Sequence, residues 1–282
     1  MSTPEGDRLL DVAASGMPEA IEAARTSVRA GRRKGGSLIP LYIATLVGGI
    51  ALWWAVAAYG GNALAPKPPA VVAAFADGIR QGWLWHHTAA SLGRVLAGFL
   101  LGVLLAIPAG FLMGWYRWAQ GLVEPWVQFF RTVPPLALIP LVIVFLGIGE
   151  VAKVFVIFLA AFLSCVIATF QGVKNVDLTL INAARVLGAK DGTIFARIVV
   201  PASTPFMFVG MRVALGSSWA TLVASELLGA PTGLGRMMQS AQQFLQTDRI
   251  VVGIIMIGLL GFVMDRLLLL AEQRLTSWQE TR

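Results

Sequence analysis

The polar side chains of one long apolar segment are the residues of this chain best suited to chemistry. They recur at intervals of three and four, so on a helix Ser218, Thr221 and Ser225 share one face. The full set is Ser217, Ser218, Thr221, Ser225 and Glu226. Hydroxyl and carboxyl groups are unfavourable in hydrocarbon unless they face protein or water. The stripe therefore predicts either the lining of a water-filled path or hydroxyls that bind the backbone of their own helix.

Two arginines stand near the inner ends of apolar segments, Arg131 in one and Arg212 in another. A guanidinium in such a place needs a negative partner. That partner is an anionic substrate, an internal carboxylate or a lipid headgroup, and the sequence leaves all three open.

Residue patterns typical of enzymes are missing from the sequence. His86 and His87 are adjacent, so on a helix they point about 100° apart and make a poor pair of metal ligands. No HExxH, GxSxG or GxxxxGK[ST] motif occurs. We expect no catalytic residues, no metal site and no cofactor bound by this chain.

Composition sets the environment of these side chains. Hydrophobic residues make up 57% of the 282 residues and charged residues 13%, about half the roughly 25% that clothes a soluble domain. The apolar residues come in runs long enough to cross a bilayer, which takes about 20 residues per helix. The chain is therefore predicted to be an all-α polytopic membrane protein, which excludes a lone water-soluble enzyme.

Six transmembrane helices are predicted within a permease-sized domain, 38–271. The spans are 38–59, 91–115, 126–148, 151–171, 205–230 and 250–271. Residues 1–37 are predicted to form a partly disordered tail with a short helix around 18–30, and 272–282 a C-terminal tail. The stretch 68–82 is too interrupted to cross and predicts an interfacial helix. Lys153, near the end of the fourth span, is expected to snorkel to the interface.

The positions of the basic residues predict the orientation. Six spans place both termini on one side, and with both inside, thirteen flanking Lys and Arg residues lie inside against five outside. The positive-inside rule favours this arrangement. It places the termini and the long loop 172–204 in the cytoplasm. The net charge of +7 thus reflects topology and not nucleic-acid binding.

A ladder of small residues marks one face of the second span. Its members are Gly98, Gly102, Ala106, Gly110 and Gly114. Spacing of four keeps them on one helix face, where small residues let a neighbouring backbone approach closely. The ladder predicts tight helix packing, and Pro108 predicts a kink.

The cytoplasmic loop 172–204 has the pattern of two short helices. Asp177 is placed to cap a helix that runs through Leu187, and Gly188 is placed to end it. A second helix from Asp191 to Val199 is predicted to stop at the prolines that follow, Pro201 and Pro205. The apolar members suit a groove on a soluble partner. They are Ile181, Ala184, Leu187, Ile194 and Phe195. A plain linker between spans is the alternative.

This loop resembles the EAA loop of ABC-importer permeases, whose pattern is EAA, three residues, Gly, nine residues, then I-x-L-P. The matching residues are Asn182, Ala183, Ala184, Gly188, Ile198, Val199, Val200 and Pro201, with the spacing intact. Asn182 replaces the Glu and Val200 replaces the Leu. Asn182 can hydrogen-bond at this point but cannot form a salt bridge.

Several other stretches narrow the resemblance, which covers the chain from about residue 40 onward. They are 130–137 (FRTVPPLA), 147–150 (GIGE), 218–226 (SWATLVASE), 233–235 (GLG), 239–241 (QSA), 244–245 (FL), 247–248 (TD) and 274–278 (RLTSW). Together they are similar to the branch that handles taurine, alkanesulfonates, nitrate and related small anions or pyrimidines, and most similar to taurine permeases.

The resemblance implies a type I ABC importer (MetI-like) permease architecture and a mechanism. Two copies of the permease, a homodimer, form the translocation path in a bacterial inner membrane, and each copy sits on a cytoplasmic ATPase subunit that uses ATP and Mg. A periplasmic or lipoprotein binding protein delivers the substrate. Coupling to the ATPase falls to the loop residues Asn182, Ala183, Ala184, Leu187, Gly188, Ile194, Phe195, Ile198 and Pro201. A self-sufficient secondary transporter is the alternative from another class, although no internal repeat supports it.

Overall fold

A computed structural model describes residues 39–59 and 66–276, and these residues form helices and turns without a strand. In chain order the elements are α2 (Ile39–Tyr59), α3 (Pro68–Arg80), α4 (Trp83–Trp115), α5 (Arg117–Thr132), α6 (Pro135–Leu146), α7 (Glu150–Lys174), α8 (Leu178–Val186), α9 (Asp191–Ile194), the π-helical turn η1 (Phe195–Val199), α10 (Val200–Leu227), α11 (Leu234–Gln243) and α12 (Thr247–Leu275). The helix expected around 18–30 lies outside the described residues. The chain divides into two units, 1–56 and 57–282, and α2, which falls largely in the first, is described by itself.

Five of the described helices are long and apolar enough to cross a membrane: α2, α4, α7, the continuous run Asp191–Leu227, and α12. The pair α5 and α6 passes the same test together. The number of apolar segments thus agrees with the six expected spans. Several helices extend beyond the apolar runs; α4, for example, begins at Trp83, ahead of residue 91. Hydropathy marks where lipid contacts a helix, whereas the helix itself continues through polar turns.

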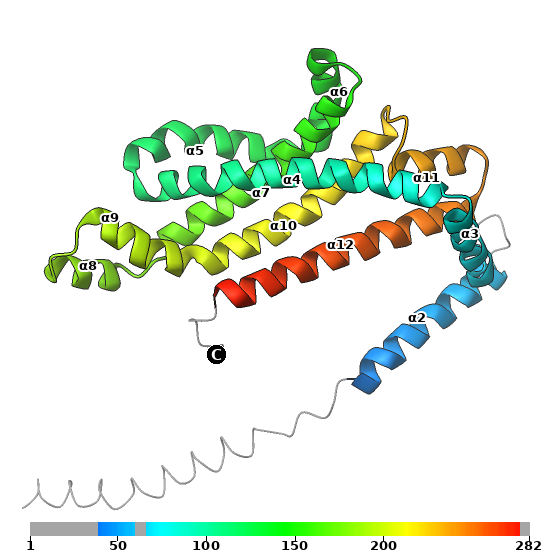
Figure 1. Cartoon of the computed structure of the whole chain (residues 1–282), viewed down its shortest axis with the longest axis horizontal. Coiled ribbons are helices and arrows are strands. Elements are labelled where there is room, and N and C mark those ends of the chain that lie inside the picture. Colours follow the sequence, from blue (N-terminus) through cyan, green and yellow to red (C-terminus); the bar gives the residue numbers. More distant parts are fainter. Residues whose placement is uncertain (1–38, 60–65, 277–282) are drawn as a thin grey trace, which may run out of the picture. The chain divides into compact units, whose positions relative to one another are not determined.

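The predicted third span, 126–148, is broken. Its two parts, Arg117–Thr132 and Pro135–Leu146, meet at 103°, and α6 turns away from α5 and α4 (Figure 1). The break lies at Val133, which is extended, followed by Pro134 and Pro135. Proline lacks an N–H and disfavours helical geometry in the residue before it. The two prolines therefore end α5 and start α6 in a new direction.

Three long helices, α4, α7 and α10, run side by side at the centre of the second unit (Figure 1). The ladder of small residues on α4 lies against α7: a Cβ on Gly102 would lie 2.6 Å from the Cβ of Ala161, and one on Gly114 would lie 2.4 Å from the Cβ of Val173. Ala106 is fully buried in the same face. The predicted packing role of the ladder is confirmed, because a side chain larger than the residue present would push the two backbones apart.

The predicted stop after Val199 is wrong. Residues Asp191–Leu227 form one helical run, in which Pro201 lies in the first turn of α10 and Pro205 inside it. The turn before them is π-helical, and the N–H of Val200 bonds to the carbonyl of Phe195, five residues back. A π-helical turn is wider than an α-helical turn, so it accommodates the missing N–H of Pro201. The cytoplasmic loop therefore connects rigidly to α10.

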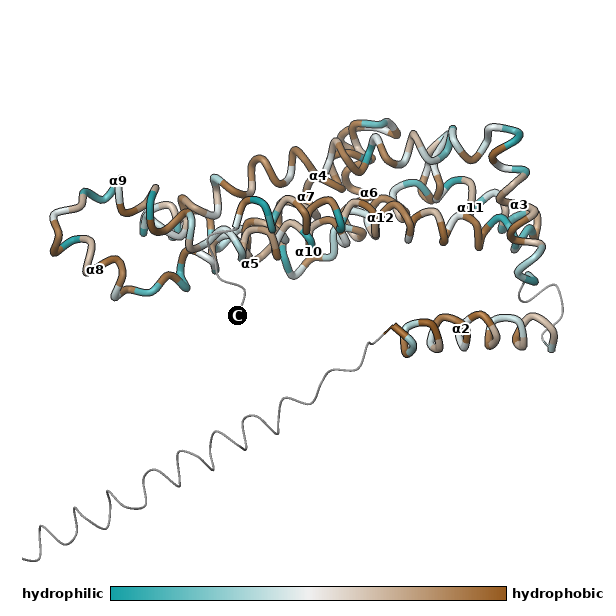
Figure 2. The backbone as a smooth tube through the Cα atoms, turned by 60° about the horizontal axis from the view of Figure 1, so that its bottom comes forward, coloured by the Kyte–Doolittle hydropathy of each residue, from teal (hydrophilic) through white to brown (hydrophobic). Residues whose placement is uncertain are grey.

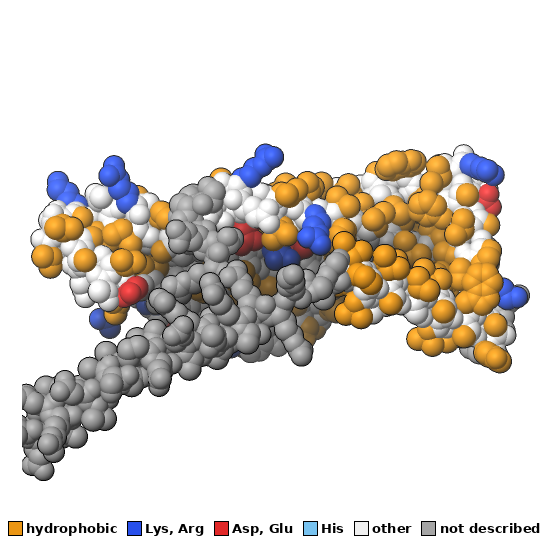
Figure 3. Space-filling view, turned by 90° about the horizontal axis from the view of Figure 1, so that it is seen from below, with side chains coloured by type: hydrophobic (Ala, Val, Ile, Leu, Met, Phe, Trp, Pro, Cys, Tyr) orange, Lys and Arg blue, Asp and Glu red, His pale blue; other side chains and the backbone are white. Residues whose placement is uncertain are grey.

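Hydropathy follows these elements. The tube of α4, α7, α6 and α12 is mostly brown, whereas polar residues interrupt α8, α9 and α11 (Figure 2). The helices α8 and α9 lie at one end of the second unit, and α3 and α11 lie at the other (Figure 1). Lys and Arg side chains stand at both ends and in the middle of the face seen in Figure 3, and hydrophobic side chains cover much of the surface between them.

Candidate functional site

A groove opens where the α5–α6 bend faces α7 and α10. It has a volume of about 340 Å³ and is lined by Arg131 from the last turn of α5, Ser164 from α7, and Ser217 and Thr221 from α10. The hydroxyls of Ser164 and Ser217 lie 3.4 Å apart. Pro134 and Pro135, which cause the bend, also line the groove. The groove thus offers one guanidinium and three hydroxyls, a set suited to an anion that accepts hydrogen bonds.

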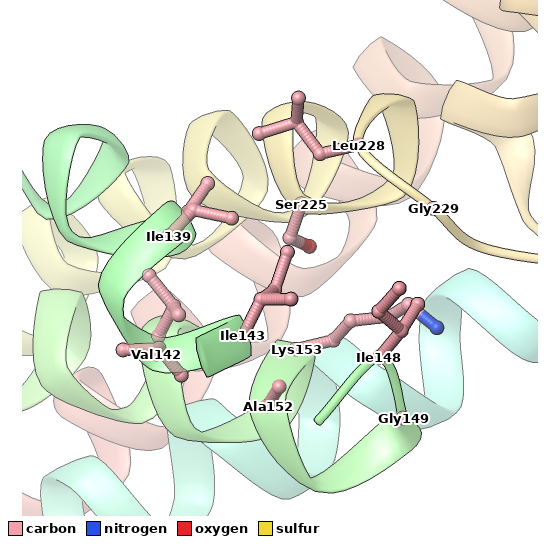
Figure 4. A pocket seen from close by; sticks show the side chains of 11 residues that line it. Ile139, Val142, Ile143, Ile148, Gly149, Ala152, Lys153, Ser225, Leu228 and Gly229 are labelled. Carbon is pink, nitrogen blue, oxygen red and sulfur yellow. The ribbon is translucent and has the colours of Figure 1, made fainter. Parts of the chain in front are cut away.

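A second, smaller pocket lies between α6, α7 and α10 (Figure 4). Its walls are mostly apolar, with Ile139 and Val142 on one side and Ser225 and Lys153 on others. The free space is about 10 Å³, roughly enough for one water molecule. This pocket is a packing defect and not a path.

A network of charges joins α4, α7 and α10 at the end opposite α8 and α9, and of its members Glu150 is 56% exposed. Arg94 donates from Nε and Nη2 to the two carboxylate oxygens of Glu150, at 2.5 and 2.8 Å. Its Nη1 donates to Oε1 of Glu226, at 2.6 Å, and to the carbonyl of Thr232, also at 2.6 Å. The side chains of Arg94 and Glu226 are 5% and 0% exposed. Each of these buried charges is therefore paired and hydrogen-bonded, as burial requires.

Lys153 belongs to the same network. Its ammonium lies 3.1 Å from Oε1 of Glu150, and the residue is only 5% exposed. The expectation that Lys153 snorkels to the interface is therefore wrong, because Glu150 provides a counter-charge one helical turn away. With Arg94 and Glu226, the network holds two positive and two negative charges.

The network also holds the loop between α10 and α11. Three successive backbone amides are bound by side chains: Gly233 donates to Nδ1 of His87, Leu234 to Oγ of Ser91, and Gly235 to Oε2 of Glu226. These N–H groups precede or begin α11, where no carbonyl of the same helix is available to them. A Cβ on Gly233 would lie 2.3 Å from the Glu226 carboxylate. Glycine is needed there so that the loop can approach the buried acid.

The loop helices α8 and α9 form a separate structure at the other end. Asp177 accepts a hydrogen bond from the amide of Thr179, at 2.7 Å, and so caps α8. Because this bond favours the ionised carboxylate, it lowers the pKa of Asp177 from its ordinary value. Gly188 has φ +81°, and the amides of Gly188 and Ala189 bond back to Arg185 and Ala184. These are the paired bonds of a Schellman motif, which confirms the predicted cap and the predicted glycine stop.

Comparison with known proteins identifies the family to which this chain belongs. The family model "Binding-protein-dependent transport system inner membrane component" matches residues 98–277. The chain belongs to this family. A "Probable ABC transporter permease protein" of Brucella abortus (strain 2308) is 60% identical, over 82% of this chain and 92% of the relative. The taurine transport system permease protein TauC of Escherichia coli (strain K12) is 37% identical, over 85% of this chain and 90% of the relative.

The fold agrees with this assignment. A solved structure of the MetNI methionine ABC transporter, in inward-facing conformations, matches with a TM-score of 0.55 at 20% identity and covers 67% of this chain and 96% of that chain. The all-α permease architecture predicted from the resemblance is confirmed. Family membership displaces the alternative of a self-sufficient secondary transporter. It also makes this chain a non-catalytic membrane-spanning subunit of an ABC importer, with an ATPase and a substrate-binding protein as partners.

The residues predicted to line the translocation path lie in different parts of the structure. Arg131, Ser217 and Thr221 line the groove. Ser218 and Ser225 are buried and donate to the carbonyls of Ala214 and Leu222 in their own helix, both at 2.8 Å. Glu226 is in the buried charge network. The stripe therefore divides into residues that line the groove and residues whose polar groups are hydrogen-bonded or ion-paired inside the protein.

Arg212 lies away from the groove. Its Nε and Nη2 donate to the carboxylate of Asp265 on α12, at 2.7 and 3.1 Å. The sequence left three kinds of partner possible for Arg212, and in the structure its partner is an internal carboxylate. This pair ties α12 to α10.

The residues predicted to couple the permease to the ATPase differ in their exposure. Asn182, Ala183, Leu187 and Gly188 are exposed, whereas Ala184, Phe195, Ile198 and Pro201 are half-buried. Ile194 is fully buried, in a cluster with Phe111, Val173 and Val199. Phe195 packs against the rings of Phe111 and Trp115. Ile194 and Phe195 therefore attach the loop to α4 and α7. The most exposed apolar residues of the loop are Val186 and Leu187, 88% and 87% exposed, beside the exposed Leu178 and Leu180.

Arg94 and its partners are the residues that the sequence interpretation missed as a set. Arg94 stands inside the second apolar segment, while Glu150 and Glu226 stand at the ends of the fourth and fifth. All three belong to the same end of their spans under the predicted topology. A charge in a span requires a partner, so this shared depth was a usable signal for the network.

Proposed function

We propose that this permease carries taurine or a related small sulfonate across the membrane. The observation that carries the proposal is the groove that brings Arg131 together with Ser164, Ser217 and Thr221. The similarity to the taurine permease TauC, 37% over most of both chains, supports the same substrate class.

The chemistry of the groove suits a sulfonate. A sulfonate has one negative charge and three oxygens that accept hydrogen bonds. The planar guanidinium of Arg131 can donate two parallel bonds to it, and Arg131 has no ion-pair partner among the described residues. The Ser164 hydroxyl donates to the carbonyl of Ala160 in its own helix, at 3.0 Å, so Ser217 and Thr221 are the hydroxyls that can donate to the third oxygen. Nitrate and other small anions also carry a negative charge and acceptor oxygens. A neutral pyrimidine has no negative charge that could pair with Arg131.

The proposed assembly follows from the family. Two copies of this chain form the path, each docked through α8 on an ATPase that binds ATP and Mg, with both termini in the cytoplasm and the binding protein on the other side. The outward residues Val186 and Leu187 suit an apolar groove on the ATPase. Because the run Asp191–Leu227 is continuous, a push on α8 and α9 is transmitted to α10, which carries Ser217 and Thr221. Such a rigid-body change alters the groove between two states.

The test is uptake into proteoliposomes that contain the permease, its ATPase and its binding protein. We expect ATP-dependent uptake of taurine and about tenfold slower uptake by Arg131→Gln, since a hydrogen-bonded charge contributes roughly 1.5–3 kcal/mol. Arg117→Gln, at the other end of the same helix α5 and outside the groove, is the matched control. Preferred uptake of uracil over taurine, with no effect of Arg131→Gln, would refute the proposal.

A further inference from the structure

A second polar groove lies at the opposite end of the second unit from α8 and α9. It is formed by α11, the start of α4 and the start of α12, and it has a volume of about 600 Å³. Two arginines line it, Arg236 from α11 and Arg249 from α12. Both are half-buried, and neither has an ion-pair partner among the described residues. The nearest acid along the chain, Asp248, does not line the groove.

The other polar groups of this groove include the side-chain amides of Gln81 and Gln246, which can donate as well as accept. The guanidinium of Arg249 lies over the ring of Trp83, 5.3 Å from its centroid, and the buried Nε1–H of Trp83 has no acceptor within the described part of the chain. His87 also lines the groove. Its Nδ1 accepts from the amide of Gly233, so a neutral ring carries its proton on Nε2 and offers one more donor. Ser240 adds a hydroxyl.

We propose that this groove is a binding site for a small organic anion, a sulfonate or carboxylate, at the entrance to the permease. Two guanidiniums and the ring N–H of His87, with no carboxylate lining the groove, form a surface rich in donors and in positive charge. An anion satisfies such a surface through charge-assisted hydrogen bonds. The role as an entrance for the substrate rests on the proposed function, whereas the binding of an anion does not.

The rest of the site is held rigidly, which favours a preformed pocket. His87 and the Gly233 amide tie the groove to the Arg94 network through the loop before α11. Arg236 is hydrogen-bonded to Gln239, at 3.1 Å, and Arg249 is held by the Trp83 ring. Donors that are already positioned lose less conformational entropy on binding.

The experiment is binding of ethanesulfonate to the full-length chain in phosphatidylcholine nanodiscs, measured by saturation-transfer NMR. All variants carry Arg131→Gln, which removes the cation of the translocation groove, so that the two anion sites are separated. We expect Arg131→Gln to retain binding and an added Arg249→Gln or Arg236→Gln to weaken it about tenfold. Arg266→Gln is the matched control, because Arg266 lies on the same helix as Arg249 and over the ring of Phe262.

Three outcomes would overturn the site. Loss of all binding in Arg131→Gln alone would leave the translocation groove as the one anion site and the proposed function intact. Equal binding by the Arg249→Gln, Arg236→Gln and Arg266→Gln proteins would show that the entrance arginines bind no small anion. Displacement of ethanesulfonate by added phosphatidylglycerol would make a lipid headgroup the occupant. Conversely, retained binding here together with failure of taurine uptake would refute the substrate and keep the site.

Discussion

Arg94 on α4 and Glu226 on α10 stand 132 positions apart in the chain, and their side chains meet at 2.6 Å in the buried interior. The pair is the centre of a network that also holds the first turn of α7 through Glu150 and the loop before α11 through Thr232 and Gly235. Three long helices and one loop are thus fixed to each other at one end. The groove that contains Arg131, Ser217 and Thr221 lies between two of these helices.

Removal of Arg94 is expected to destabilise the permease strongly. In Arg94→Gln the carboxylate of Glu226 loses its counter-charge and is left buried, whereas Glu150 is exposed and keeps Lys153. Breaking a buried pair in this way costs about 3–5 kcal/mol. The measurement is the thermal unfolding midpoint of the full-length chain in detergent, followed by the fluorescence of a thiol-reactive dye at the buried Cys165.

Arg266→Gln serves as the control, since Arg266 contacts the Phe262 ring and forms no ion pair with a described residue. Its midpoint should stay close to that of the unchanged chain. Equal midpoints for the Arg94→Gln and Arg266→Gln proteins would mean that the network contributes nothing to stability.

The packing of α4 against α7 gives a second prediction. Gly102→Ala places a methyl group 2.6 Å from the Cβ of Ala161 and 2.9 Å from the carbonyl oxygen of Phe158. Neither neighbour is a flexible side-chain end, so the helices must separate, which typically costs about 1–3 kcal/mol. Gly93→Ala, on the same helix with nothing within 4 Å of the new methyl group, should be neutral or slightly stabilising. The comparison uses unfolding midpoints, and a destabilised Gly93→Ala beside a normal Gly102→Ala would contradict it.

The sequence predicted those parts of the fold that depend on local patterns. The small-residue ladder, the Asp177 cap and the Gly188 stop each consist of residue types at fixed spacing within one segment. The family resemblance likewise depended on spacing between Ala184, Gly188 and Pro201. Hydropathy located the apolar segments, since lipid contact is read along one helix at a time.

Relationships between segments could not be predicted in the same way. The pairing of Arg94 with Glu226 depends on the relative rotation of two helices, and the division of the serine stripe depends on which neighbour faces each hydroxyl. The prolines show a different limit. Pro134 and Pro135 stand at the break between α5 and α6, whereas Pro201 and Pro205 lie within α10, where a π-helical turn precedes Pro201. Proline therefore stands at the end of one helix and inside another, and the residue type alone does not predict which.

Coupling to the ATPase gives a third prediction. Leu187 is 87% exposed, so Leu187→Asp should leave the fold of the permease unchanged. It should abolish taurine uptake if α8 docks in an apolar groove, because a buried carboxylate without a partner is strongly unfavourable there. Uptake and ATP hydrolysis are measured on the same proteoliposomes, and the expected result is loss of substrate-stimulated hydrolysis together with uptake.

Leu245→Asp is the matched control, since Leu245 is 86% exposed at the opposite end of the second unit. That protein should assemble with the ATPase normally. Normal uptake by the Leu187→Asp protein would remove α8 from the docking surface.

The cap of α8 gives a fourth prediction, on pH. The amide of Thr179 lowers the pKa of Asp177 in the folded protein, so the cap stabilises α8 fully above the ordinary pKa of about 3.8. That stabilisation is lost as the pH falls through the lowered pKa of the folded state. Hydrogen exchange of residues 178–187, corrected for the intrinsic rate, should therefore be constant from pH 7 to pH ~5 and faster well below the ordinary pKa.

Substitutions at the cap separate the charge from the hydrogen bond. Asp177→Asn keeps an acceptor for Thr179 but cannot titrate, so exchange in α8 should lose this pH dependence. Asp177→Ala removes the acceptor, and α8 should exchange faster at every pH, because the amide of Thr179 then loses its cap. The helix α11, which begins without a side-chain cap from its own N-cap residue, should exchange identically in all three proteins. Unchanged protection of α8 in the Asp177→Ala protein would show that packing against the rest of the loop, and not the cap, holds this helix.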